Sequence, residues 1–530
     1  MATVTLQKAL GAYYTDEPAV CRLVQWAVSA GSDSVLDPSC GDGAFLAAAR
    51  SRLLSLGARR PHIYGVDINE RALQTAGDRV SGVHLVQSDF FDVEPEALPR
   101  FDAVVGNPPF IRYQTFNGGK TSKGHLRAEE AGVSLPKLAS SWAPFLVHAT
   151  RFLKVGGRLG MVMPSELGHA MYARDVLRFL LEHFHHVAIE MFRENIFQGL
   201  SQSTVLLLCD GYGEPCRTLL VCASDDLGGR DRQVVRADVS AVKSGRFRLT
   251  RYLIPEAARV LYEGLAADRR VKRLGDVADV GIGYVTGGND FFHLSQQERH
   301  ELGVPPQYLR PALLNLRNVT DVQYRREHWD ERRAAGDKVY LLSVPPVPKN
   351  KLPSPLQCYL GSGENAGISN RFKCRIREFW YSVPHVRTPD AFLSYMSGEQ
   401  PLLVINTANL VAPNTVHLVR FERDCDPLSV AVAWRNSLTK LSCEIEGHAL
   451  GGGLFKLEPS EAENVLVLQA TAVQTKVLSK QLPNRIAESE ERALDLVDRC
   501  VLRGRLGLSL PECESLRDAA SRMESWRKHK

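Results

Sequence analysis

The sequence predicts an α/β fold in its first half, with a doubly wound parallel sheet, followed by a mixed α+β domain and a helical C-terminal segment. Short β-like runs alternate with helical periods up to about residue 210. From about residue 269, short strand-like runs stand among many Gly, Pro and Asn residues, and beyond residue 471 the chain becomes helical and charged. Because 530 residues are too many for one core, we expect several domains. Their predicted bounds are 1–222 for the first domain, 223–268 for a linker, 269–470 for the second domain and 471–530 for the helical segment.

The strands of the first half are predicted from apolar runs, and the helices from apolar residues that recur with helical spacing. Thr15 can cap the first helix and Pro18 suits its first turn. The strand candidates are 34–38, 62–68, 83–90, 101–107, 157–164, 185–192 and 203–210. The helical patterns lie at 18–29, 43–56, 69–80, 140–153 and 170–184. Because the connection between the last two strands is too short for a helix of any size, we expect them to end the sheet as an antiparallel pair.

Composition excludes several classes of protein. With 44% hydrophobic and 24% charged residues, the chain is ordinary for a globular protein. The N-terminus has no basic segment followed by a long apolar run, and no stretch approaches about 18 uninterrupted apolar residues, so we expect neither a secretory signal nor a membrane span. The eleven cysteines are scattered without zinc-finger spacing, which favours reduced thiols in a cytoplasmic protein and no metal site.

The net charge of +5 conceals a gradient along the chain. Residues 1–230 hold 22 basic and 24 acidic side chains, whereas the remainder holds 43 basic and 36 acidic. Most of this excess lies in residues 325–377, with 11 basic against 5 acidic side chains. A basic second half indicates a polyanionic partner, although a solvated face with a modest basic bias accounts equally well for the charge alone.

Glycines and acidic or amide side chains follow four successive strands of the first half. The first strand ends in "DPSCGDGAF", and the next three end in Asp67, Asp89 and Asn107. Because the carboxyl ends of parallel strands meet at one edge of the sheet, we expect a single ligand-binding crevice there. The glycine turn lacks the third glycine of the dinucleotide fingerprint, but an Asp at the second strand end is a natural partner for ribose hydroxyls.

The fourth strand leaves the sheet through "GNPPF". Proline has no amide hydrogen, so the Pro-Pro pair offers carbonyl acceptors without competing donors, and the Asn107 side chain adds another acceptor. Two fixed acceptors suit a group with two N–H bonds, such as an exocyclic amine, and Phe110 could stack on the ring that carries it. The alternative is a rigid loop with an Asx turn and no binding role.

The order of these motifs resembles one family of enzymes. The segments "GAYYTDEPAV", "VLDPSCGDGAFL", "YGVDINERAL", "SDFF" and "GNPPF" are followed by "FLKVGGRLGMVMPSEL" and "IFQGLSQSTVLLL". This series is similar to gamma-class, TaqI-like N6-adenine DNA methyltransferases of type II restriction–modification systems. The resemblance implies a Rossmann-like S-adenosylmethionine-dependent methyltransferase domain, with a DNA target recognition domain after it.

The resemblance also implies a set of residues that bind S-adenosylmethionine. They are Tyr14, Thr15, Asp37, Pro38, Gly41, Gly43, Asp67, Ile68, Asp89 and Phe90. In the family, the first two lie near the methionine part, and Asp37 with the glycines forms the main binding turn. Asp67 would hold the ribose hydroxyls with Ile68 against the adenine ring. Asp89 would accept from the adenine amine, with Phe90 packed beside it.

For the target base, the resemblance implies that Asn107 and Pro108 hold the amine, that Phe110 stacks on the base and that Phe197 supports it from the other side. The substrate would be double-stranded DNA, from which the base is flipped, and the enzyme would act as a monomer on DNA. Two departures stand out: Phe110 replaces the commoner Tyr, and "TDEP" replaces the usual Thr-Pro pair of the N-terminal motif.

The second half resembles the recognition domains of the same enzymes, more loosely, over about 269–462. A basic surface would position phosphates while a few side chains contact base edges. Candidates for base contacts are Asn289, Arg317, Asn406 and Asn414, although each residue type is more often found in turns or caps. No nuclease pattern surrounds "RTPDAF", so DNA cleavage would belong to a separate cognate restriction endonuclease or to none.

Other functions remain open from the sequence. RNA and protein-glutamine methyltransferases share the Asn-Pro-Pro-aromatic motif, cytosine N4 is a possible target, and an inactive DNA specificity protein could retain the fold. Cys216 in "EPC" imitates a cytosine C5 nucleophile but follows the last sheet strand, which favours a structural thiol. The glycines of "GIGYVTGG" favour a turn, and the histidines at 183, 185 and 186 favour a solvated helix end over a metal site.

Overall fold

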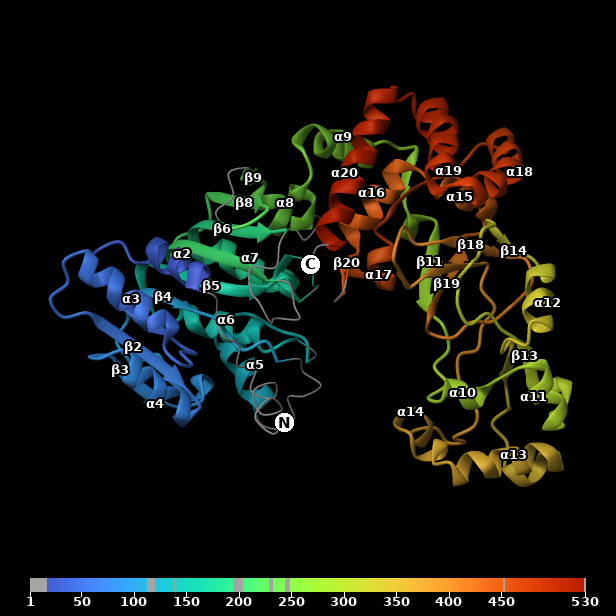
Figure 1. Cartoon of the computed structure of the whole chain (residues 1–530), viewed down its shortest axis with the longest axis horizontal. Coiled ribbons are helices and arrows are strands. Elements are labelled where there is room, and N and C mark those ends of the chain that lie inside the picture. Colours follow the sequence, from blue (N-terminus) through green and yellow to red (C-terminus); the bar gives the residue numbers. More distant parts are fainter. Residues whose placement is uncertain are drawn as a thin grey trace. The chain divides into compact units, whose positions relative to one another are not determined.

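The computed structural model divides into two compact units between Ile254 and Pro255 (Figure 1). It describes residues 17–111, 120–137, 139–168, 170, 172–193, 204–227, 232–243, 248–450 and 453–528. We call residues 17–254 the N-terminal unit and residues 255–528 the C-terminal unit.

The N-terminal unit is built on a nine-stranded sheet with the order β3-β2-β1-β4-β5-β7-β6-β8-β9. The strands are β1 (Ser34–Asp37), β2 (His62–Asp67), β3 (His84–Gln87), β4 (Phe101–Gly106), β5 (Leu153–Pro164), β6 (Phe184–Phe192), β7 (Thr204–Tyr212), β8 (Thr218–Ser224) and β9 (Gln233–Ala237). The five strands from β3 to β5 pair in parallel, so the predicted doubly wound α/β fold is confirmed.

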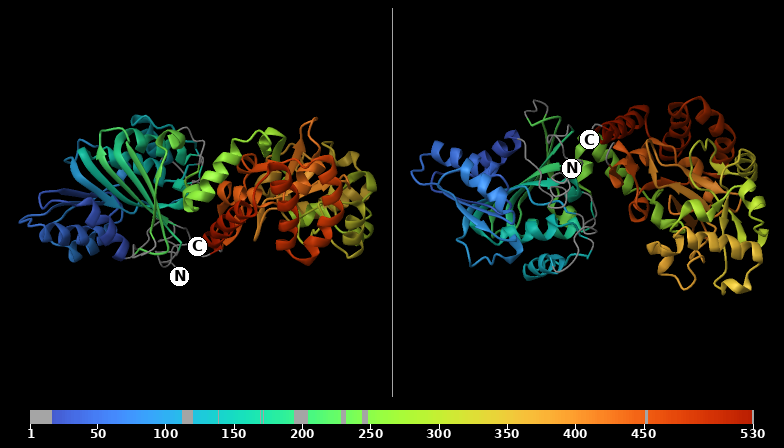
Figure 2. Two further views of the ribbon diagram at one scale, coloured as in Figure 1. Left: turned by 90° about the horizontal axis from the view of Figure 1, so that it is seen from above. Right: turned by 60° about the horizontal axis from the view of Figure 1, so that its bottom comes forward.

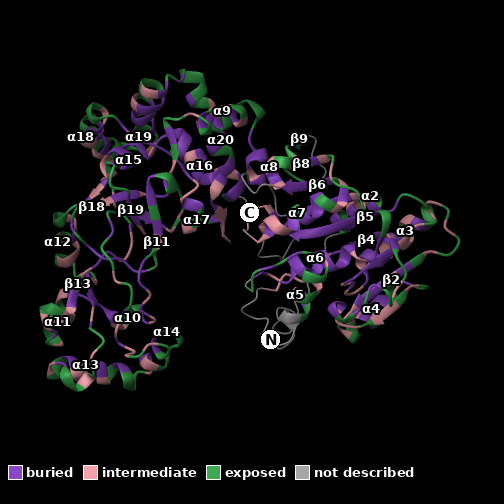
Figure 3. Cartoon of the chain, turned by 180° about the vertical axis from the view of Figure 1, so that it is seen from behind, coloured by how far each residue is buried: buried purple, intermediate pink, exposed green. Residues whose placement is uncertain are grey.

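Helices cover this sheet and supply its core. They are α2 (Glu17–Ala27), α3 (Ala44–Ser55), α4 (Glu70–Arg79), α5 (Lys120–Glu130), α6 (Trp142–Thr150), α7 (Ala173–His183) and α8 (Val239–Lys243), with short 3₁₀ turns η1 (Phe90–Asp92), η3 (Ser165–Gly168) and η4 (Leu249–Leu253). One face of α2 carries the apolar side chains of Val20, Leu23, Val24 and Ala27, which are buried as the helical spacing predicts. The β4 side chains of Ala103 and Val105 belong to the same apolar cluster, because alternate residues of a strand share a face. The middle of the sheet is accordingly coloured as buried in Figure 3.

The predicted antiparallel pair, β6 and β7, is present, but the prediction that it ends the sheet is wrong. The sheet continues because β8 pairs in parallel with the open edge of β6, and β9 pairs antiparallel with β8. The segment 223–268, expected as a linker, therefore contains sheet structure and also α8, η4 and helix α9 (Glu256–Ala266).

The C-terminal unit combines four small sheets with many short helices. Its main sheet has the order β11-β19-β16-β18-β14, with β11 (Ala278–Ile282), β14 (Gln323–Tyr324), β16 (Ala391–Ser394), β18 (Leu403–Asn406) and β19 (Val416–Phe421). The other strands are β10 (Val271–Arg273), β12 (His293–Leu294), β13 (Leu309–Pro311), β15 (Tyr340–Leu342), β17 (Met396–Ser397), β20 (His448–Ala449), β21 (Phe455–Lys456) and β22 (Leu466–Leu468). This mixed α+β architecture agrees with the irregular pattern of the sequence.

The helices of the C-terminal unit connect these strands or pack on them. Besides α9 they are α10 (Asn289–Phe292), α11 (Gln296–Glu301), α12 (Arg326–Ala334), α13 (Ser354–Asn365), α14 (Phe372–Arg375), α15 (Pro427–Ala433), α16 (Ser437–Glu446), α17 (Pro459–Ala462), α18 (Ala472–Glu488), α19 (Glu490–Val497) and α20 (Leu510–Lys528). Short 3₁₀ turns lie at η5 (Leu274–Asp276), η6 (Pro306–Tyr308), η7 (Lys349–Lys351) and η8 (Ile368–Asn370), and the π-helix η10 (Asp498–Leu506) follows α19.

The C-terminal helices are packed onto the rest of their unit. In Figure 2 the red helix α20 lies beside the orange segment that contains α16. Buried Arg527 of α20 donates to the carboxylate of Glu444 at 3.0 Å. The Asp498 carboxylate, which is 3% exposed, accepts from the Ser437 amide at 2.8 Å. These buried polar contacts join residues 471–528 to α16, so the helical segment shares the core of the C-terminal unit.

Candidate active site

Asp37 is the last residue of β1 and is almost fully buried, at 1% exposure. Its Oδ1 accepts a hydrogen bond from the Ser39 amide at 3.1 Å. A Cβ atom at Gly106 would lie 2.7 Å from this oxygen, so the end of β4 can approach β1 only with glycine there. Burial, together with the neighbouring carboxylates of Asp67 and Asp42, raises the Asp37 pKa to about 8.

The turn after β1 leads directly into α3. Gly43 caps this helix at φ +84, in the left-handed region that glycine adopts without strain. The Gly41 amide, two residues earlier, donates to Asp67 Oδ2 at 2.8 Å. The predicted glycine turn therefore lies against the carboxyl end of β2, as expected from neighbouring parallel strands.

Asp67 joins two loops through one carboxylate. While Oδ2 accepts from Gly41, Oδ1 accepts from the Asn69 amide at 2.8 Å, and the Asn69 side chain caps α4. Since each carboxylate oxygen has two acceptor sites, both retain capacity for a further donor. Ile68 lies next to Asp67 and is 44% exposed, so an apolar side chain is available beside a polar one.

Asp89 and Phe90 follow β3 but point to different surroundings. The Asp89 carboxylate accepts from the Phe91 amide at 3.2 Å and remains partly exposed. The Phe90 ring is 4% exposed and lies 4.9 Å from Phe145 and 4.8 Å from His148, measured between ring centroids. Phe90 is thus anchored in the core, where it supports the turn that carries Asp89.

His148 on α6 is a supporting residue that the sequence analysis missed. Burial lowers its pKa to about 4, so the ring is neutral at neutral pH. Its Nε2 lies 3.2 Å from the Phe90 carbonyl and 3.1 Å from the Val93 carbonyl, so a proton on Nε2 is donated to them. Nothing in the local sequence "FLVHATRFL" distinguishes this histidine from a solvated one.

The Asn-Pro-Pro-Phe segment begins where β4 ends. The Ser39 hydroxyl donates to the Asn107 carbonyl at 3.0 Å, which ties this segment to the turn after β1. Pro108 is buried, whereas Asn107 and Phe110 are partly exposed. Phe110 packs against the apolar cluster that includes α2 and α3. The sequence-predicted residues at four strand ends are therefore brought to one edge of the sheet.

Ser141, just before α6, holds the other end of this segment. Its hydroxyl donates to the Pro109 carbonyl at 2.5 Å and accepts from the Ile111 amide at 2.9 Å, while its own amide donates to the Ile111 carbonyl at 3.1 Å. Three hydrogen bonds from one residue thus fix the loop that carries Asn107. No pattern in the sequence predicts this role for Ser141.

A second polar cluster lies next to Ser141. The Glu166 carboxylate accepts from the Tyr172 hydroxyl at 2.5 Å and from the Ser140 hydroxyl at 3.3 Å. The indole of Trp142, the first residue of α6, donates to the Tyr172 hydroxyl at 3.0 Å. Glu166 lies two residues after the end of β5, so the strand-end rule that identified Asp67 and Asp89 could have found it too.

The remaining residues named from the sequence lie outside the described ranges or on elements that do not form this edge of the sheet. Tyr14, Thr15 and Phe197 lie outside the described residues. Burial raises the pKa of the half-buried Cys216 thiol, which agrees with a structural thiol. The Asn406 side chain is buried and donates to the Pro389 and Leu410 carbonyls, each at 2.9 Å, so it supports loops of the C-terminal unit. Asn289, Arg317 and Asn414 are exposed.

Comparisons with known proteins identify the family. The profile described as "N-6 DNA Methylase" matches residues 1–221, and that described as "Type II methyltransferase M.Eco57I, C-terminal domain" matches residues 247–502. The chain belongs to the N6-adenine DNA methyltransferases of restriction–modification systems. Dependence on S-adenosylmethionine is general to this family. The predicted family and function are confirmed, whereas the assignment of this methyltransferase to the gamma class stays a prediction.

Individual relatives of the methyltransferase are distant. It is 20% identical to the type II methyltransferase M.AccI of Acinetobacter calcoaceticus, over 92% of this chain and 91% of the relative. It is 26% identical to M.HincII of Haemophilus influenzae, over 37% of this chain and 36% of that one. The type IIL restriction–modification enzyme MmeI, solved in complex with DNA, has a similar fold, with a TM-score of 0.54 at 11% identity over 96% of this chain and 75% of its own.

Two further properties concern the described ranges only. No helix within them has the length and apolar character needed to cross a membrane. Nor do any three His, Cys, Asp or Glu side chains in those ranges lie together in a way that could hold a metal ion.

Proposed function

We propose that the methyltransferase binds S-adenosylmethionine at the carboxyl edge of β1, β2 and β3 and transfers its methyl group to the N6 amine of an adenine flipped out of duplex DNA. The observation that carries this proposal is the hydrogen bond from Ser39 to the Asn107 carbonyl. It joins the glycine turn after β1 to the Asn-Pro-Pro-Phe segment, so a methyl donor on the first would adjoin an amine on the second.

The residues at this edge fit the cofactor. Asp67 keeps acceptor capacity on both carboxylate oxygens for a pair of ribose hydroxyls, and Ile68 offers an exposed apolar surface for a flat purine. Asp89 is partly exposed and could accept from the purine amine. At Gly41 no atom other than those of the glycine and its two chain neighbours lies within 4 Å of where a Cβ would be, which leaves the backbone open to a ligand. When bound, the cofactor supplies a methyl group activated by a sulfonium.

The Asn-Pro-Pro-Phe segment would hold the target amine. The Asn107 side-chain oxygen and the Pro108 carbonyl would accept its two N–H bonds, which draws the nitrogen lone pair out of conjugation with the ring. The nitrogen is then a better nucleophile, and catalysis arises from positioning and from acceptors fixed in advance. Since the proton can leave after transfer, no strong general base is needed. Ser39 and Ser141 hold the acceptors in place.

An amine inside a duplex is out of reach, so the base must leave the helix at a cost of a few kcal/mol. Stacking on an aromatic ring stabilises the flipped base by about 1–3 kcal/mol. Phe110 is partly exposed beside Asn107 and would provide one ring, and Phe197 would provide the opposite one. We further propose that residues 1–222 perform catalysis, that residues 269–470 recognise the target sequence and that residues 471–530 support them.

The decisive experiment incubates the full chain with radiolabelled S-adenosylmethionine and duplex DNA, and then identifies the modified base after hydrolysis. We expect N6-methyladenine. Label in N4-methylcytosine would contradict the proposed target, and label only in added RNA or protein would contradict the substrate. Sequencing with detection of modified bases would give the recognition sequence.

A further inference from the structure

The basic residues of the segment 325–377 are of two kinds: those that form ion pairs with carboxylates and those that do not. All of this segment is described, and six of its eleven basic residues form ion pairs with carboxylates. Four of the five others lie together in the segment "RFKCRIR", and they are Arg371, Lys373, Arg375 and Arg377. Within residues 325–377, the positive charge that the fold leaves without carboxylate partners is therefore concentrated in and around α14.

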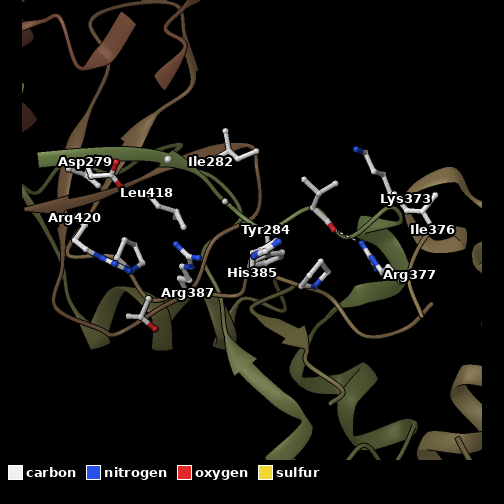
Figure 4. Close-up of a pocket in the computed structure, with 17 residues that line it drawn as sticks. Asp279, Ile282, Tyr284, Lys373, Ile376, Arg377, His385, Arg387, Leu418 and Arg420 are labelled. Atoms are coloured by element: carbon white, nitrogen blue, oxygen red, sulfur yellow. Dashed lines mark hydrogen bonds between the residues drawn. The ribbon is translucent and has the colours of Figure 1, made fainter. Parts of the chain in front are cut away.

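This segment forms one end of a pocket of about 640 Å³ in the C-terminal unit. Figure 4 shows Lys373, Ile376 and Arg377 at that end and Arg420 of β19 at the other, with His385 and Arg387 between them. We call this the basic pocket. Asp279 of β11, directly across from Arg420 in the strand register, is the single acidic residue of its lining.

None of the lysine and arginine side chains of the basic pocket forms an ion pair with a carboxylate among the described residues. Arg377 donates to the carbonyls of Val285 at 2.6 Å and Thr286 at 2.9 Å, so its position is fixed while its charge is retained. Lys373, Arg387 and Arg420 are exposed and have no carboxylate oxygen within the 4.0 Å limit of an ion pair. Most arginines elsewhere in this unit's helices do have one, so the lining favours an external anion.

Apolar side chains lie among these cations. Ile376 is 62% exposed, Phe372 is 63% exposed and Ile282 of β11 is 58% exposed. His385 holds φ +57, a left-handed conformation that is costly outside glycine, in the loop that carries Arg387. Cations interleaved with exposed apolar groups match a polymer that presents both phosphates and bases, because a small anion or an acidic peptide would leave the apolar groups in water.

We propose that the basic pocket is where the C-terminal unit holds duplex DNA. Lys373, Arg387 and Arg420 bind successive phosphates, and Ile282 and Ile376 lie against sugars and base edges. This inference rests on the proposed function, because it assigns a location to the DNA on which that function acts. It also assigns the phosphate contacts to residues that the sequence analysis did not name.

The test measures how duplex binding by the full chain depends on salt. Each phosphate contact that is lost should reduce the slope of log K against log salt by about 1, because fewer counterions are released. Arg387→Ala and Arg420→Ala should each show this loss, and the double variant about twice as much. The loss should be equal on two duplexes of unrelated sequence, since phosphates carry no sequence information.

The matched control is the double variant Lys476→Ala/Lys480→Ala on α18, which also removes two exposed basic charges from the same unit. It should keep the wild-type slope. Because Arg387 and Arg420 are exposed, their variants should keep the wild-type melting temperature, which separates lost contacts from lost folding.

The inference is overturned if the wild type methylates DNA while both arginine variants keep its affinity and slope, or if the control loses as much. A loss confined to one duplex sequence would also contradict phosphate contacts. In contrast, the wild type could bind duplex DNA with the expected loss of slope in the arginine variants and yet methylate no base. That result would contradict the proposed function but support the basic pocket as a DNA-binding surface.

Discussion

The carboxyl edge of the N-terminal sheet and the basic pocket use charge in opposite ways. At the sheet edge, the carboxyl groups of Asp37, Asp67 and Asp89 accept hydrogen bonds from backbone amides of the chain itself. In the basic pocket, Arg387 and Arg420 are exposed and have no carboxylate partner. The first arrangement fixes the shape of loops, whereas the second leaves charge available for a partner.

This difference predicts how each region responds to substitution. A change at the sheet edge alters the positions of loops that hold small groups to fractions of an ångström, so it should affect catalysis or folding. A change in the basic pocket removes only a contact at the surface, so it should affect DNA binding and its salt dependence. The following substitutions test this contrast, from the largest expected effect to the smallest.

Asn107→Ala should reduce methyl transfer by about 100- to 1,000-fold, because removal of one fixed hydrogen-bonding group at a reacting centre costs this much in other enzymes. The measurement is transfer of radiolabel from S-adenosylmethionine to DNA. Affinity for the cofactor should stay at the wild-type value. Activity within a few-fold of the wild type would refute the role given to Asn107.

Asp67→Ala should weaken binding of S-adenosylmethionine by about 10- to 100-fold, as expected for loss of hydrogen bonds to a charged acceptor. Isothermal titration calorimetry would measure the dissociation constant. Asp78→Ala, which removes an exposed carboxylate from α4, serves as the control and should bind normally. Equal affinities for all three proteins would contradict a ribose site at Asp67.

Ser141→Ala should lower kcat by about 10-fold, because Pro109 and Ile111 each lose a hydrogen bond and the loop loses its alignment. The KM values for DNA and cofactor should change little, since Ser141 need not touch either. Ser141→Thr keeps the hydroxyl and should restore most of the rate. If Thr fails to restore it in a folded protein, the positioning role is incorrect.

Asp37→Asn should change the pH dependence of stability. Burial raises the folded-state pKa to about 8, well above the value of an exposed carboxyl, so the folded protein holds a proton that the unfolded chain releases. Wild-type stability therefore falls as the pH rises from about 4 to about 8, and Asn removes this contribution. The difference in melting temperature, variant minus wild type, should therefore increase as the pH rises from about 5 to about 8. For the control Asp78→Asn this difference should not change with pH. If the difference for Asp37→Asn also stays constant, the raised pKa of the buried Asp37 carboxyl is contradicted.

Much of the candidate site could be predicted because its residues follow strands. Parallel strands place their carboxyl ends at one edge, so Asp37, Asp67, Asp89 and Asn107 needed only the strand pattern to be brought together. The contacts that hold them could not be predicted in this way. Ser141 lies more than thirty residues after Asn107 and meets its segment only through the fold. Likewise, the local sequence does not predict that the Phe90 ring is buried in the core while Asp89 remains partly exposed.

The sequence by itself determined the α/β class, the order of the motifs and the hydrogen-bond acceptors that the Asn-Pro-Pro-Phe segment offers, because these depend on local periodicity and on residue types at strand ends. Only the tertiary structure decided which charges stay available. In residues 325–377 the composition shows eleven basic side chains, but packing pairs six with carboxylates and leaves four others around α14. Ion pairing depends on distances between side chains across elements, and sequence spacing does not fix these distances.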